Sequence, residues 1–129
     1  MKPLVIGLSD LQEDAIKVKL GSTTANGDHV VRAGQQIVVD GHENPTTGYQ
    51  LMWEAQGSAA AAVKLIDSSY KLDSHLIGAG GIHTFLFEVD ETANSGDSFE
   101  LMWNNARSWE KPEGGFFAEP SDAVAFTIA

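Results

Sequence analysis

The stretch that decides the fold runs from residue 44 to residue 55 and reads NPTTGYQLMWEA. In its second half Tyr49, Leu51 and Trp53 alternate with polar or flexible neighbours, which is the period of a strand with one buried face. The same alternation recurs at residues 82–90, 98–104 and 124–128, and shorter apolar runs lie at 4–8, 15–20, 29–32, 36–41 and 63–70. No stretch has a helical period. Strands spaced by turns predict an all-β fold, an antiparallel β-sandwich of about seven strands in one domain spanning residues 1–129, with an up-and-down barrel as the second choice.

The first half of the same stretch predicts a pre-shaped protrusion between two strands. Pro45 fixes its own φ and donates no backbone hydrogen bond, and it biases Asn44 toward an extended shape. Gly48 can adopt a positive φ, while Thr46 and Thr47 are stiff and carry small hydroxyl groups. The protrusion holds no charged residue. Taken alone, it is more typical of an ordinary hairpin connection.

Strand order predicts which loops share one end of the sandwich. If successive strands run in opposite directions, the connections 42–48, 71–81 and 105–121 lie together, as binding loops do in antibody variable domains. The second of these contains Gly78-Ala79-Gly80-Gly81, which is either a flexible return or a close backbone approach to a partner. The third contains Trp109, which either covers the core or anchors a protein partner. Trp53 and Trp103 occupy inward strand positions and are expected in the core.

Composition excludes several classes of function. The formal net charge is −10, so neither a nucleic acid nor an anionic membrane surface is an expected partner. The absence of cysteine excludes disulfides, thiolate metal sites and a cysteine nucleophile. No metal-ligand spacing relates the histidines, which are His29, His42, His75 and His83. We therefore expect no catalytic site, no metal and no cofactor. The opening run MKPLVIG is too short to be a signal peptide or a membrane span.

Three motifs together resemble those of the chagasin family. Residues 44–49 (NPTTGY), 78–81 (GAGG) and 107–109 (RSW) follow the order and rough spacing of that family over the region from Val30 to the C-terminus. Two departures stand out: Ser108 occupies the place of the usual proline, and Leu51 stands where the family tends to have a tryptophan.

The resemblance implies an immunoglobulin-like sandwich that acts as a reversible, tight-binding inhibitor of papain-like cysteine proteases and is not an enzyme. By resemblance, the loop carrying Thr46 and Thr47 enters beside the catalytic Cys and His of a protease, and the other two loops grip either side. The implied protease-binding residues are Asn44, Pro45, Thr46, Thr47, Gly48, Tyr49, Gly78, Ala79, Gly80, Gly81, Arg107, Ser108 and Trp109. We expect such an inhibitor to act as a monomer. The alternative function is an immunoglobulin-like adhesion or carbohydrate-binding module, and an enzyme ranks last.

Overall fold

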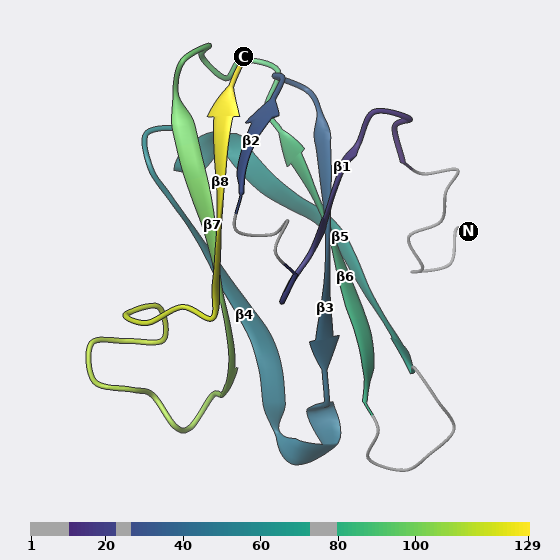
Figure 1. Cartoon of the computed structure of the whole chain (residues 1–129), viewed down its shortest axis with the longest axis vertical. Helices are drawn as coiled ribbons and strands as arrows, with labels where there is room; N and C mark the ends of the chain where they lie inside the picture. Colours follow the sequence, from purple (N-terminus) through teal and green to yellow (C-terminus); the bar gives the residue numbers. More distant parts are fainter. Residues whose placement is uncertain (1–10, 23–26, 73–79) are drawn as a thin grey trace.

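A computed structural model describes residues 11–22, 27–72 and 80–129, and in these ranges the chain forms a sandwich of two four-stranded sheets (Figure 1). One sheet has the order β1-β3-β6-β5, with the bounds Ile16–Lys19, Gln36–Glu43, Gly81–Val89 and Val63–Leu72. The other has the order β2-β8-β7-β4, with the bounds Asp28–Val31, Asp122–Ile128, Ser98–Arg107 and Tyr49–Gln56. The predicted strand at residues 4–8 lies outside the described residues. In the described part, no helix is long and apolar enough to cross a membrane.

Alternating side chains build the core, as the sequence predicts. On β6, Phe85, Phe87 and Val89 point between the sheets and are no more than 4% exposed. On the facing sheet, Trp103 of β7 is fully buried, and its ring packs edge-on against Phe85 at 5.0 Å between centroids. Trp53 of β4 is partly buried and packs edge-on against Phe87 at 4.9 Å. Burial of these aromatic faces from water is the main force that holds the two sheets together.

The sandwich is confirmed, but its sheets are mixed rather than purely antiparallel. Successive strands do run in opposite directions, yet β1 pairs in parallel with β3, and β2 pairs in parallel with β8. Both parallel pairs sit at sheet edges and involve the two short N-terminal strands. The described strands number eight, against about seven expected, and the apolar runs at 15–20 and 29–32 supply the edge strands β1 and β2.

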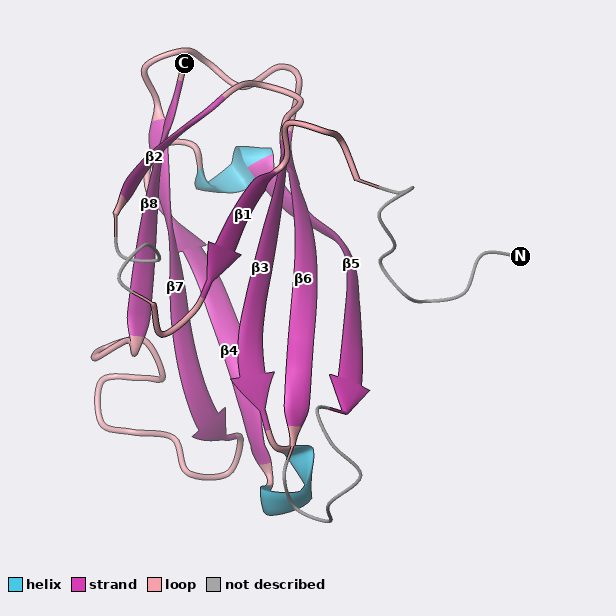
Figure 2. Cartoon of the chain, turned by 45° about the vertical axis from the view of Figure 1, so that its right-hand side comes forward, coloured by secondary structure: helices cyan, strands magenta, loops and turns pink. Residues whose placement is uncertain are grey.

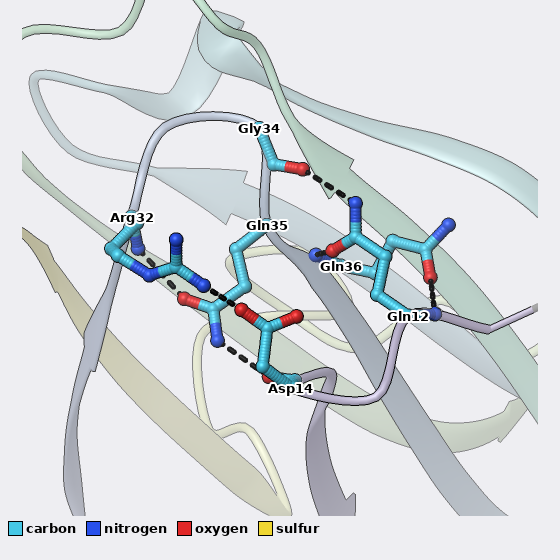
Figure 3. Close-up of polar contacts among 6 residues, drawn as sticks. All are labelled: Gln12, Asp14, Arg32, Gly34, Gln35 and Gln36. Carbon is cyan, nitrogen blue, oxygen red and sulfur yellow. Dashed lines mark hydrogen bonds and ion pairs between the residues drawn. The ribbon is translucent and has the colours of Figure 1, made fainter.

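Polar contacts fasten the N-terminal segment to the turn between β2 and β3 (Figure 3). Gln12 and Gln36 exchange backbone-to-side-chain hydrogen bonds of 2.7 and 3.1 Å. Gln35 donates to the carbonyl oxygen of Asp14 at 2.6 Å, and the Asp14 carboxylate pairs with Arg32. These contacts help to hold β1, the edge strand of its sheet, alongside β3.

The connection between β3 and β4 is the one that positions the site. It joins strands of different sheets through a 3-10 turn, η2 (Pro45–Thr47), at one end of the sandwich (Figure 2). The hairpin interpretation of this loop is therefore wrong, because β3 pairs with β6 and β4 pairs with β7. A second 3-10 turn, η3 (Ala60–Ala62), lies in the alanine-rich run between β4 and β5.

Candidate functional site

The tip loop, residues 44–48, forms a closed turn with no buried residue in its 3-10 segment. Pro45 opens the turn and Gly48 ends it with φ 82°, a left-handed conformation that side chains with a Cβ rarely adopt. The N–H of Gly48 donates to the carbonyl oxygen of Pro45 at 3.0 Å, and the N–H of Thr47 donates to that of Asn44 at 3.2 Å. The sequence of the loop thus fixes its backbone without help from a partner.

Asn44 also holds both threonine hydroxyls of the tip loop. The Thr46 hydroxyl donates to Oδ1 of Asn44 at 2.6 Å, and the Thr47 hydroxyl donates to the backbone oxygen of Asn44 at 2.8 Å. Both hydroxyl hydrogens are therefore used inside the loop. Toward a partner the two side chains can offer methyl groups and oxygen lone pairs, so the tip is less polar than the sequence alone suggests.

The third loop lies directly against the tip loop. The indole of Trp109 covers Gly48: a Cβ atom at Gly48 would lie 3.2 Å from Cζ2 and Cζ3 of Trp109, and closer still to Cη2. Trp109 is nevertheless 68% exposed, so most of its ring faces solvent. It does not cover the core, and of the two interpretations left open for it, an exposed position is confirmed.

Arg107 ties the third loop to the tip loop. Its Nε donates to the carbonyl oxygen of Thr47 at 3.0 Å, and its guanidinium lies 4.5 Å from the ring centre of Tyr49 and 5.9 Å from that of Trp109. A hydrogen-bonded ion pair of 2.9 Å with Glu110 raises the pKa of Arg107 above its ordinary value. The cation thus lies close to two aromatic rings, a favourable arrangement for a guanidinium.

A turn takes the place of the proline that the third motif lacks. Arg107 is the last residue of β7, and the N–H of Glu110 donates to its carbonyl oxygen at 3.0 Å across Ser108 and Trp109. The third loop therefore begins at residue 108, later than the expected residue 105, because pairing of β7 with β4 continues to the partner Tyr49. This hydrogen bond and the Arg107–Glu110 ion pair restrict the backbone at Ser108.

The glycine motif flanks the other side of the tip loop. Gly80 has φ 76°, and a Cβ atom there would lie 2.8 Å from the carbonyl oxygen of Glu43 and 3.1 Å from Cβ of Asn44. At Gly81, the first residue of β6, a Cβ atom would lie 2.8 Å from the carbonyl carbon of Lys71. Both glycines are thus required by close approach within the chain itself. Gly78 and Ala79 lie outside the described residues.

Beneath the tip loop lies a polar cluster that the sequence analysis missed. Glu43, the last residue of β3, is 6% exposed, and its carboxylate contacts His83 and the backbone N–H of Leu51. Strand alternation carries a signal for it, because Glu43 shares the inward face with Ile37 and Val39. Burial of a carboxylate without partners is costly, so an acidic residue at an inward position implies a hydrogen-bonded site.

The described residues offer no metal centre. In residues 11–22, 27–72 and 80–129, no three His, Asp or Glu side chains are grouped so as to hold an ion. His83 pairs with Glu43, and His29 stacks on Phe126 at 5.2 Å. His75 lies outside the described residues.

Comparison with known proteins gives a family and a fold. The model of the chagasin family peptidase inhibitor I42 matches residues 30–128. The crystal structure of the cysteine protease inhibitor EhICP2 from Entamoeba histolytica is similar with a TM-score of 0.60 and 16% identity, over 92% of this chain and 98% of that one. The solution structure of Amebosin follows with a TM-score of 0.59 and 16% identity, over 89% and 98% of the two chains. PbICP-C, solved in complex with falcipain-2, has a TM-score of 0.50 and 12% identity, over 88% and 99%. No curated protein sequence matches the chain significantly.

Proposed function

The chain belongs to the chagasin family of peptidase inhibitors, and from that membership we propose that it blocks papain-like cysteine proteases by filling the active-site cleft with its tip loop. It is an inhibitor and not an enzyme. The observation that carries the proposal is the meeting of three loops at one end: Gly80 on one side of the tip loop, and Arg107 and Trp109 on the other. The relatives named above support the choice of target, since EhICP2 is a cysteine protease inhibitor and PbICP-C was solved with falcipain-2.

The tip loop suits a cleft that holds a thiolate and an imidazolium. Cleavage by such a pair needs a peptide carbonyl placed in line with the sulfur and polarised by free hydrogen-bond donors. In the tip loop the carbonyl oxygens of Asn44, Pro45 and Thr47 each accept an internal hydrogen bond, within a turn rather than an extended strand. The loop can therefore fill the cleft without offering a well-placed scissile bond.

The internal bonds of the site also favour tight and reversible binding. Asn44, Gly48 and Arg107 order the tip loop before any partner arrives, so association freezes little additional motion. Trp109 supplies a large exposed aromatic surface of the kind that anchors protein interfaces. We propose that the protease-binding set comprises Asn44, Pro45, Thr46, Thr47, Gly48, Tyr49, Gly78, Ala79, Gly80, Gly81, Arg107, Ser108 and Trp109.

We further propose that the inhibitor works as one domain and as a monomer. Its net charge of −10 opposes self-association and directs it away from nucleic acids and anionic membranes. A single copy brings Gly80, the tip loop, Arg107 and Trp109 together, so no second copy is needed to complete this part of the site.

Titration of papain tests the proposal. Residual activity should fall stoichiometrically with added inhibitor, return on dilution, and leave the inhibitor uncut when the mixture is analysed by mass spectrometry. Trypsin, a serine protease, should be unaffected in a parallel titration. Papain activity that is unchanged at micromolar inhibitor would contradict the proposal, and glycan binding by the same sample would then favour the adhesion or carbohydrate-binding alternative.

A further inference from the structure

Glu43 connects the tip loop to both sheets. Its Oε2 accepts a hydrogen bond from the backbone N–H of Leu51 on β4 at 2.6 Å, and its Oε1 lies 3.0 Å from Nδ1 of His83 on β6. Its backbone oxygen accepts a hydrogen bond of 3.3 Å from the hydroxyl of Tyr70 on β5. One residue thus touches three strands besides its own.

The position of these bonds along the chain gives them a specific effect. Glu43 directly precedes Asn44, where the tip loop begins, and Leu51 follows shortly after Gly48, where the loop ends. A single carboxylate therefore closes the base of the loop from inside the sandwich. The backbone of Glu43 also lies against Gly80, since a Cβ atom there would stand 2.8 Å from its carbonyl oxygen.

We propose that Glu43, together with His83, is a positioning residue for inhibition: it contacts no protease, but it sets the angle at which the tip loop leaves the sandwich. The inference rests on the proposed function and extends it to a buried pair. If the bonds at the base are lost, the loop samples other orientations. The apparent inhibition constant then rises by the inverse of the fraction that stays in the binding geometry.

The chemistry of the Glu43–His83 pair predicts a pH dependence of inhibition that a general packing role of Glu43 would not produce. A carboxylate only accepts hydrogen bonds, so it suits a His83 ring that donates from Nδ1, whether neutral or protonated. The side-chain amide of a Glu43→Gln variant must accept from Leu51 with its oxygen and therefore turns its NH₂ toward His83. That arrangement needs a free lone pair on Nδ1, which a protonated ring does not have.

Aromatic and ionisable groups of the neighbouring strands surround the pair. Tyr70 faces the pair from β5, and its ring lies 6.3 Å from that of His83. Phe85 stacks on His83 at 4.1 Å, and on the neighbouring face Cε1 of His42 lies near Gly80. The guanidinium of Arg107, on β7, is engaged by Thr47 and Glu110.

The experiment measures inhibition constants against papain between about pH 5.5 and 8, the range in which an imidazole gains its proton. Each value is divided by that of the unmodified inhibitor at the same pH, which cancels the protease's own titration. A ratio above one means weaker inhibition by the variant. For Glu43→Gln the ratio should stay below about three at pH 8 and rise to about ten or more at pH 5.5. Adding His83→Gln to that variant removes the imidazole, so the ratio should become flat. Glu54→Gln makes the same charge change on an exposed position of β4 and should keep a ratio near one.

The possible outcomes distinguish failure of the role of Glu43 from failure of the proposed inhibitory function. Inhibition by the unmodified protein with a flat ratio for Glu43→Gln would overturn the role of Glu43 and leave the proposed function standing. No inhibition by the unmodified protein would overturn both. If Glu43→Gln does not fold, as judged by circular dichroism, His83→Gln alone serves. Its ratio should rise as the pH falls, because a glutamine at position 83 cannot form an ion pair with Glu43, and a flat ratio would again refute the proposal.

Discussion

Replacement of Gly48 by alanine is the sharpest test of how the site is built. The left-handed φ of 82° costs an alanine about 1–2 kcal/mol. The new Cβ would also lie 3.2 Å from two ring atoms of Trp109. It would lie closer than 3.0 Å to a third ring atom, a distance that real Cβ atoms essentially never show. The indole must therefore withdraw by roughly 1 Å, and because it is exposed it can do so at little cost in stability.

The backbone cost at Gly48 predicts a change in stability, and the collision with Trp109 predicts a change in inhibition. The melting temperature should fall by about 3–8 °C, the equivalent of the backbone cost for a chain of this size. The inhibition constant should rise by about 10- to 100-fold, because the tip loop and its anchor no longer fit one cleft together. Gly96→Ala is the matched control: it has φ 91° at the opposite end of the sandwich, and nothing lies within 4 Å of its Cβ.

Thermal melts and papain titrations of both variants decide the matter. Gly96→Ala should lose stability to a similar degree and inhibit normally. In a Trp109→Ala background the collision is absent, so Gly48→Ala should then weaken inhibition by less than about threefold further. The reasoning would be refuted if Gly48→Ala inhibited as well as Gly96→Ala, or if its effect were the same with and without Trp109.

Three further predictions concern the tip, the third loop and a distant turn. Thr47→Arg should weaken inhibition by about 100-fold or more and leave the melting temperature unchanged. The control Thr127→Arg, at an exposed position on the end of β8 far from the tip loop, should have no effect. Equal inhibition by the two variants would exclude the tip loop from the mechanism. Ser108→Pro should raise stability by about 0.4–1 kcal/mol in urea titrations and keep or tighten inhibition, since proline suits the second position of a turn; a clear loss would show that the backbone there cannot accept it. The Thr92 hydroxyl donates to Asp90 at 2.6 Å and is the main cause that holds the pKa of this carboxyl below its ordinary value. Asp90 therefore stabilises the fold above about pH 4 and ceases to do so as the pH falls through its lowered pKa. Thr92→Ala should be less stable than the unmodified protein at pH 7 but not at pH 2, and a difference independent of pH would contradict this.

The sequence by itself determined the strands and the chemistry of the loops. Alternation at Phe85, Phe87 and Val89 specifies which face of β6 is buried, because a period of two is a local property of the chain. The tip loop is similarly local: Pro45 and Gly48 fix its turn, and no distant residue is needed to predict that it protrudes. The order of the strands then predicts which loops share an end.

Only the tertiary structure decided what each of these groups meets. Alternation marks the Glu43 position as inward, but its partners Leu51 and His83 come from two other strands, and no local pattern identifies them. Likewise, Trp109 covers Gly48 because β7 pairs with β4 as far as Tyr49, and the parallel pairs at the sheet edges arise from the path of the N-terminal segment. Such contacts join residues far apart in the chain, and they follow from how two sheets pack rather than from the preferences of any one segment.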